Sequence, residues 1–235
     1  DDQDAVKYYV EEKKVNLTNN ADFEYSQTAA HIATKCGNLK ILKYLLEKEP
    51  ALVDIEDSDG NKIFFLAIEN NRLDIVKYLA ERQLVNIRVR NSGCFDNTAI
   101  HSAAKYGHLA ILEYFLNQIN NVNILNRFHQ PPVFLAAENQ HHHIIRYLAE
   151  EKDANLTLVD RHGHNILYKA VNNDDVVLMR YVLDERKAPL DINWRDTFGQ
   201  TLVHRAANLN KYEALVYLVN EKHGDMDTID IWKQT

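Results

Sequence analysis

The chain has 235 residues, of which 46% are hydrophobic and 26% charged, a composition typical of a folded protein and not of a disordered one. Its 34 acidic and 27 basic residues give a net charge of −7, which argues against nucleic-acid or anionic-membrane partners. No apolar run reaches the roughly 18–20 residues of a membrane-spanning helix. The two cysteines form no CxxC pair, which excludes a disulfide framework and indicates a reducing, intracellular location.

The N-terminal segment, residues 1–27, predicts the second helix of a truncated repeat followed by a long hairpin. Its acidic start lacks the basic region of an export signal. Asp4–Val10 has the pattern of a second helix with no first helix before it. From Asn16 to Thr28 is twelve positions, where most other links take eight, so we expect a projecting finger. With no complete polar cap at either end, we expect the segment to be an excerpt from a longer array or a larger protein.

Six similar units follow. Their opening runs begin at residues 28, 62, 98, 131, 165 and 201, so successive openings lie 33 to 36 residues apart. The run Thr28-Ala-Ala-His-Ile-Ala33 is one example. About nine residues further on, a glycine, asparagine or glutamine precedes a second amphipathic run, such as Gly37–Leu46. This period predicts six repeats, which occupy residues 28–61, 62–97, 98–130, 131–164, 165–200 and 201–234.

These units resemble the ankyrin repeat, whose pattern is T-P-L-H-x-A-A-x-x-G-H at a period near 33. The resemblance covers nearly the whole chain. It is weakest in the central units, where the opening threonine is replaced by Lys62, Pro131 and Asn165, and the histidine by Phe65, Phe134 and Tyr168. The resemblance implies an all-α repeat solenoid of stacked helix-turn-helix units with β-hairpin loops, curved with a concave face.

Stacking is also what the residues require. Each short helix has one apolar stripe, which a single pair of helices cannot bury, whereas a row of pairs can. A small residue at one position of every unit lets adjacent first helices approach closely: Ala33, Ala67, Ala103, Ala136, Ala170 and Ala206. The opening threonines are expected to cap their helices. The family histidines, His31, His101 and His204, are expected to bond the backbone between units and not to bind ligands.

The links between units are predicted to be hairpin turns. Gly60, Gly163 and Gly199 supply the residue that tolerates a positive φ. The link from Asn86 to Thr98 is again twelve positions and predicts a second finger. A third insertion, around residues 187–189, lengthens the link after the fifth unit. Thr235 falls on the next opening position, 34 residues after Thr201.

Motifs that carry chemistry are missing from the sequence. It contains no GxGxxG, GxxxxGK[ST], GxSxG or HExxH, so we expect neither catalysis nor a cofactor in this segment. The one conspicuous cluster is His141-His142-His143. Consecutive helical side chains point about 100° apart and cannot converge on a metal. We therefore interpret the cluster as surface side chains, with a metal site or a pH-sensitive patch as less favoured alternatives.

The resemblance implies that partners meet the hairpin tips and the solvent side of the first helices. Aromatic and arginine side chains dominate the energetics of interfaces, and the tips are rich in both. For Trp194 and Phe198 the alternative is packing against the neighbouring hairpin. Trp232 falls at a further tip. The candidate partner-binding residues are Phe95, Lys105, Tyr106, Arg127, Phe128, Glu138, Asn139, Arg161, Lys169, Trp194, Arg195, Phe198, Arg205 and Leu209.

Two of these candidates, Lys169 and Arg205, occupy the same position of adjacent units. Like charges side by side suggest either solvent exposure or an acidic partner segment.

We predict a scaffold for protein–protein interaction in the cytoplasm. The alternative is the target-recognition segment of a larger enzyme, toxin or secreted bacterial effector, whose catalytic domain lies outside these residues. A bacterial effector would act in the host cytoplasm, and the Asn-, Lys- and Tyr-rich usage is typical of AT-rich genomes such as those of some intracellular bacteria. A third possibility is that the repeats pack against a neighbouring domain of their own protein.

Overall fold

The computed structural model describes residues 2–18, 26–91 and 95–231. Within these ranges the chain is an all-α repeat solenoid with one short two-stranded sheet, as predicted. It divides into two compact units, each treated separately below. Unit 1 comprises residues 1–103 and 108–118, and unit 2 comprises residues 104–107 and 119–235. The predicted finger between Asn16 and Thr28 lies largely outside the described residues, as do Trp232 and Thr235.

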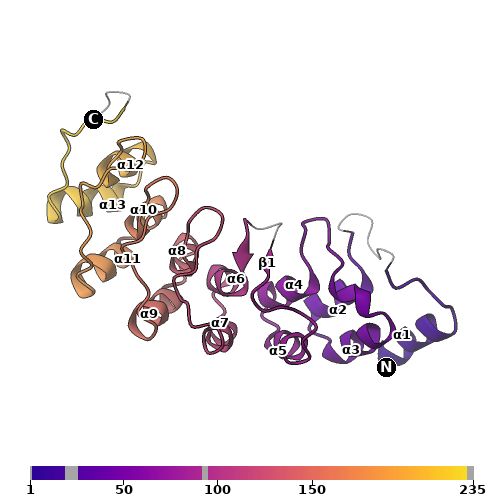
Figure 1. Cartoon of the computed structure of the whole chain (residues 1–235). Helices are drawn as coiled ribbons and strands as arrows, with labels where there is room; N and C mark the ends of the chain where they lie inside the picture. The colour runs from indigo at the N-terminus through magenta and orange to yellow at the C-terminus, as the bar shows by residue number, and fades with distance from the viewer. Residues whose placement is uncertain (1, 19–25, 92–94, 232–235) are drawn as a thin grey trace. The chain divides into compact units, whose positions relative to one another are not determined.

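Unit 1 consists of helix pairs in two layers (Figure 1). The first helices α2 and α4 contact each other, each packs on the second helix of its own pair, and the second helices α1 and α3, and α5 and α7, are in contact. Its elements are α1 (Asp2–Glu11), α2 (Ala29–Cys36), α3 (Leu39–Lys48), the 3₁₀ turn η1 (Pro50–Val53), α4 (Ile63–Glu69), α5 (Leu73–Glu81), β1 (Arg90–Asn91), β2 (Asn97–Thr98), the first turns of α6 (Ala99–Tyr106) and α7 (Leu109–Leu116).

The link from Asn86 to Thr98 carries the sheet. Strands β1 and β2 pair antiparallel, with Arg90 opposite Thr98 and Asn91 opposite Asn97. The predicted second finger therefore has a true hairpin base, and the other described links are turns without strands.

Unit 2 repeats the two-layer arrangement (Figure 1). Helix α10 packs between α8 and α12, and each of these first helices packs on its own second helix or the π-helical turn that follows it. The elements are α8 (Pro132–Glu138), α9 (His142–Glu150), α10 (Ile166–Asn172), α11 (Val176–Arg180), the π-helical turn η3 (Tyr181–Glu185), α12 (Leu202–Asn208), α13 (Tyr212–Val216) and the π-helical turn η4 (Tyr217–Glu221).

The equivalent small residues lie in the first helices, which meet as α2 and α4 in unit 1 and as α8, α10 and α12 in unit 2. The six equivalent alanines are all buried, five of them completely and Ala33 at 6% exposure. Ala170 thus sits in the helix that packs against both α8 and α12. Adjacent first helices lie so close together that this position has room for a methyl group and for no larger side chain, as expected from the sequence.

The opening threonine and the histidine three positions later form one hydrogen-bonded element. The Thr28 amide donates to His31 Nδ1 at 3.1 Å, and Thr201 and His204 make the same contact at 3.2 Å. Because Nδ1 of His31 accepts, its Nε2 carries the proton and donates to the Ile55 carbonyl in the following link at 3.1 Å. The predicted role of this histidine between units is confirmed.

In the fifth unit, where a tyrosine replaces the histidine, the hydroxyl makes the bond to the following link, whereas Phe65 and Phe134 have no polar group that could do so. Tyr168 is completely buried, and its hydroxyl donates to the Gln200 carbonyl in the following link at 2.5 Å. Asn165 replaces the opening threonine and caps α10, since its Oδ1 accepts from the Leu167 amide at 3.0 Å. The fifth unit therefore departs from the family pattern in residue type and keeps part of its hydrogen bonding.

A second set of polar contacts joins each repeat to the one before. Helices leave their last carbonyls without partners inside the helix. Here a side chain in the turn before the next second helix reaches back to such a carbonyl. The pairs are Arg72 to Lys35 O (2.7 Å), His108 to Glu69 O (3.0 Å), His141 to Lys105 O (2.9 Å) and Asn173 to Ala137 O (3.1 Å).

The stacking of α12 predicts a contrast between neighbouring alanines. Ala206 is completely buried and Ala207, on the same helix, is exposed. Ala206→Leu should lower the free energy of unfolding by about 1–3 kcal/mol, because the added methylenes have no space. Ala207→Leu should change it by less than about 0.5 kcal/mol. Urea denaturation of both variants checks this, and equal effects would contradict the close packing of the first helices.

Burial of His31 predicts a stability that depends on pH. Burial lowers the pKa of His31 below its ordinary value of 6.5, so the unfolded chain takes up its proton first. The free energy of unfolding therefore has its full value above pH 6.5 and falls as the pH drops below 6.5, by up to about 1.4 kcal/mol per pH unit. NMR titration should show His31 protonating below pH 6.5, with His31→Gln assigning its signal. A midpoint at or above 6.5 would contradict the buried neutral ring.

Candidate functional site

Each hairpin tip is built on a buried Asp or Asn. In the tip at residues 158–164, Asp160 Oδ1 accepts the amides of His162 (2.9 Å) and His164 (3.1 Å), two and four residues on. The third residue after Asp160 is Gly163, whose φ of 76° confirms the predicted left-handed turn. The same pair of bonds is made by Asp57, Asn126 and Asp196.

These buried residues, named the tip anchors from here on, were not predicted from the sequence, although they recur with the repeat period. A buried Asp or Asn recurs 34 to 36 residues apart, at residues 57, 91, 126, 160, 196 and 230. Such side chains often bond their own backbone in turns. Each anchor points into the chain and holds the tip backbone, so the described side chains on either side of the anchor face solvent.

Adjacent tips of unit 2 are in direct contact through their backbones. The Arg161 amide donates to the Phe128 carbonyl at 3.0 Å, and the Thr197 amide donates to the His162 carbonyl at 2.9 Å. Residues 124–130, 158–164 and 192–200, named the unit 2 tips from here on, therefore form one continuous surface. Its side chains come from three successive repeats.

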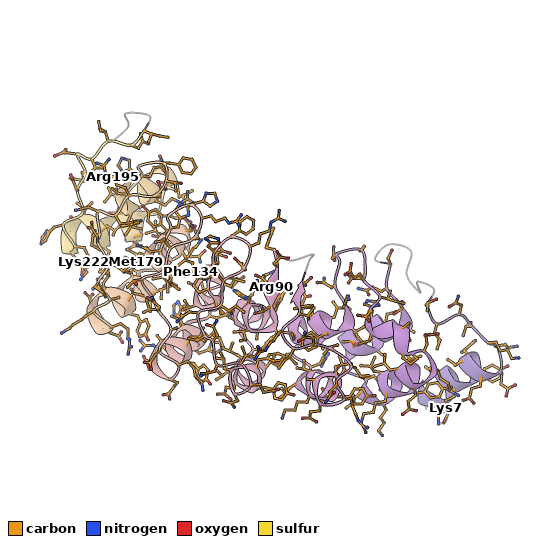
Figure 2. All side chains as sticks on the ribbon, in the orientation of Figure 1. Lys7, Arg90, Phe134, Met179, Arg195 and Lys222 are labelled. Carbon is orange, nitrogen blue, oxygen red and sulfur yellow. The ribbon has the colours of Figure 1, made fainter. Side chains whose placement is uncertain are left out.

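The tip residues singled out from the sequence are on this surface, with one exception. Arg127, Arg161 and Arg195 are exposed, and Phe128 is half-buried. Figure 2 labels Arg195 among the connecting loops of unit 2. The exception is Phe95, which belongs to unit 1 and is 58% exposed.

Trp194 and Phe198 are at once packed against a neighbouring tip and open to solvent. Trp194 Nε1 donates to the Gly163 carbonyl at 2.8 Å, and the Phe198 ring stacks on His162 with centroids 6.4 Å apart. Even so, Trp194 is 42% and Phe198 40% exposed. Packing between hairpins thus fixes the orientation of both rings without covering them.

The candidates at the ends of the first helices lie beside the tips. Glu138 is exposed, and its Oε1 accepts from Gln130 in the first unit 2 tip at 2.9 Å. Leu209 is 39% exposed, and Arg205 is half-buried with its Nε donating to Asn172 Oδ1 at 2.8 Å. The remaining candidates are Asn139, which is exposed, and Lys105 and Tyr106, which are half-buried. The Lys105 ammonium group lies 4.9 Å from the centroid of the Tyr106 ring.

Of the two explanations offered for the like charges at Lys169 and Arg205, solvent exposure or an acidic partner segment, exposure is wrong for Lys169. Only 5% of Lys169 is exposed, and its Nζ lies 2.8 Å from Asp160 Oδ2 and 2.9 Å from Glu138 Oε1. The physical reason is that two acidic groups lie beside the Lys169 ammonium group, the buried anchor Asp160 and Glu138 at the end of the preceding first helix. The ammonium group is therefore used within the chain.

Asp160 is the centre of a buried polar network. His164 lies between two tip anchors, with Nδ1 3.6 Å from Asp160 Oδ2 and Nε2 3.2 Å from Asp196 Oδ2. Burial by itself would raise the pKa of Asp160, but hydrogen bonds from His164 and Lys169 outweigh it and hold that pKa well below 3.8. The anchor is consequently ionised over the whole physiological range.

Of the three consecutive histidines, His142 points away from the other two, whereas the rings of His141 and His143 lie side by side with centroids 6.0 Å apart. The interpretation as surface side chains is incomplete, because each ring has a partner within the chain. His141 bonds the Lys105 carbonyl, and His143 bonds the Gly107 carbonyl at 3.0 Å. His142 points to the following repeat, with Nε2 2.6 Å from Asp175 Oδ2. Across the described ranges no three His, Cys, Asp or Glu residues gather closely enough to hold a metal ion.

The Lys169–Asp160 pair predicts a large and recoverable loss of stability. Lys169→Met leaves a buried carboxylate without its cation and should cost about 3 kcal/mol of unfolding free energy. Adding Asp160→Asn should recover most of that loss, because the amide oxygen still accepts both tip amides and carries no charge. A double-mutant cycle by urea denaturation measures the coupling. Additive losses would show that the pair does not determine the stability of the tip.

The comparisons with known proteins agree with this architecture. The sequence matches the family description "Ankyrin repeats (3 copies)" over residues 1–91, 81–160 and 100–193. It is 30% identical to Ankyrin repeat protein OPG189 of Variola virus over 179 residues, which are 75% of this chain and 30% of that protein.

Two further relatives are longer proteins of other kinds. The chain is 27% identical to NAD-dependent deacetylase sir2B of Dictyostelium discoideum, over 77% of this chain and 24% of that protein. It is also 27% identical to Alpha-latroinsectotoxin-Lt1a of Latrodectus tredecimguttatus, over 59% of this chain and 10% of that protein. The chain thus spans less than a third of each of these relatives.

None of the helices in the described ranges combines the length and the hydropathy that crossing a bilayer demands. The stacked helix pairs, the repeat period and the family match agree. This chain belongs to the ankyrin-repeat family.

Proposed function

We propose that this segment binds a partner protein on the tip surface, defined as the unit 2 tips together with the adjoining helix ends at Lys105, Tyr106, Glu138, Asn139, Arg205 and Leu209. In ankyrin arrays this is the concave side. Ankyrin repeats typically mediate protein binding and are generally non-catalytic. The observation that carries the proposal is the row of exposed aromatic and arginine side chains on three bonded tips.

The rigidity of the tips supports binding. Each tip backbone is held by a buried anchor and by a bond to its neighbour, and the two largest exposed rings are held by Gly163 and His162. Binding to a surface whose side chains are already ordered loses less conformational entropy than binding to flexible loops. Tryptophan, phenylalanine and arginine are also the residue types in which binding energy concentrates.

Removal of the aromatic rings should abolish tight binding without unfolding the chain. The variant Phe128→Ala/Trp194→Ala/Phe198→Ala should raise the Kd of captured partners by roughly thirtyfold or more, because hot-spot rings contribute about 2 kcal/mol or more. Quantitative affinity capture from cell extract, followed by titration of the purified partner, measures this.

The matched control is Val177→Ala/Tyr212→Ala. These side chains are even more exposed, at 63% and 69%, but lie on α11 and α13 in the second-helix layer. Partners that the tip variant loses and the control retains support the proposal. If the control loses the same partners, or if the tip variant retains them all, the tip surface is not the binding site.

A second candidate function is target recognition within a larger enzyme, toxin or secreted effector. It is favoured by the relatives, which include an NAD-dependent deacetylase and a latroinsectotoxin of which this chain spans 24% and 10%. In that case the tip surface selects the target and a separate domain acts on it. The complete sequence of the protein that contains these residues decides the matter, since catalytic motifs beside the array would favour this candidate and an uninterrupted array would not.

The location proposed for the segment is the cytoplasm, or the host cytoplasm for a bacterial effector. The support is the composition, with only two cysteines, of which Cys36 is free and exposed. Packing of the tip surface against another domain of the same protein is the remaining possibility. It predicts that the tip variant lowers the stability of the full-length protein and leaves external partners unaffected.

A further inference from the structure

The unit 2 tips have a charge opposite to that of the chain. The whole sequence carries a net charge of −7. Between residues 124 and 130, 158 and 164, and 192 and 200, however, the only carboxylates are Asp160 and Asp196, and both are at most 7% exposed. The same segments present three exposed arginines and the exposed histidines His129 and His162. The charge that reaches solvent from the tips themselves is therefore positive.

Two of these arginines differ from the other arginines of unit 2. Each of the other five donates to a group of the chain: Arg146 to Glu185, Arg180 to Glu221, Arg186 to the Ala149 carbonyl, Arg195 to the Ile229 carbonyl and Arg205 to Asn172. The side chains of Arg127 and Arg161 make no hydrogen bond or ion pair with any group in the described ranges. Both residues are exposed, so each guanidinium group keeps its five N–H donors available for a partner.

Arg127 and Arg161 are placed to act on one ligand. Each follows a tip anchor directly, Asn126 or Asp160, so they occupy the same position in adjacent tips. The two tips are bonded through the Arg161 amide and the Phe128 carbonyl at 3.0 Å. A ligand lying across the tips therefore meets both guanidinium groups in succession.

Apolar side chains alternate with the arginines. Leu125 and Val159 precede the two anchors and are 37% and 40% exposed. The buried anchor turns inward between them, so each tip presents an aliphatic side chain and a guanidinium group to solvent on either side of it. A guanidinium group pairs with a carboxylate in a planar, two-bond geometry.

We propose that the unit 2 tips bind an extended segment of a partner protein in which acidic residues alternate with apolar ones. The proposal rests on the proposed function and names the chemistry of the partner. Carboxylates of the segment pair with Arg127 and Arg161, and its apolar side chains lie on Leu125, Val159 and the exposed aromatic rings. A phosphate backbone could pair with the same arginines, but a chain of net charge −7 repels a polyanion at longer range.

The test is a selection of short random peptides displayed on phage, carried out with the whole chain as bait. Peptides enriched on the wild type should combine a net negative charge with aromatic or aliphatic residues. Synthetic copies should bind Arg127→Glu/Arg161→Glu at least about tenfold more weakly, and the affinity for the wild type should fall as salt is raised. A labelled random RNA oligonucleotide is titrated in parallel.

The matched control is Lys40→Glu/Arg88→Glu, which makes the same change in net charge at exposed positions of unit 1. It should leave peptide binding unchanged, and circular dichroism checks that both variants remain folded. Enrichment of neutral or basic peptides, equal loss in the control, absence of any enriched peptide, or tighter binding of the RNA would each overturn the proposal. Neutral peptides that are lost on removal of the tip aromatic rings would leave the proposed function intact and refute only the acidic partner.

Discussion

A helix pair in this chain has an apolar face that only the next pair can cover. Ala170 shows the constraint most clearly, because it is completely buried in a helix that packs against both α8 and α12. Close approach of the first helices requires a small residue there, and the required spacing in turn places the tips of adjacent repeats within hydrogen-bonding distance. The contact between the Arg161 amide and the Phe128 carbonyl is therefore a consequence of how the helices stack.

Hydrogen bonds between neighbouring repeats add to the apolar packing of their helices. His31 spans from its own helix start to the Ile55 carbonyl in the following link, and His141 reaches back to Lys105 in the preceding helix. Both act on backbone groups that would otherwise lack a partner away from water. Neighbouring repeats consequently have a defined register, which apolar packing alone, being non-directional, does not provide. A binding surface assembled from three repeats depends on that register, because Trp194 and Phe198 are oriented by the preceding tip.

The fold could be predicted from the sequence because the residues that allow helix pairs to stack recur at a fixed spacing along the chain. Alanine recurs at one position of the first helices, and the glycines at residues 37, 60, 107, 163 and 199 all lie in turns where φ is positive. The site was harder to predict. The exposure of the arginines follows from their place in the turns, whereas the burial of Lys169 depends on its ion pair with Asp160, whose equivalent in the preceding tip, Asn126, carries no charge. That compensation involves residues nine positions apart on different elements, and a pattern within one unit does not reveal it.

The residues that determine the backbone path of a tip are different from the residues that would contact a partner. One inward Asp or Asn accepts two amides and thereby determines the backbone path of a tip, so the outward residues on either side of it contribute little to that path. Arg127 and Leu125 could thus be exchanged for other side chains while the loop keeps its course. An array of this kind can acquire a new target through a few surface substitutions, by natural drift or by deliberate grafting of a foreign epitope-binding sequence.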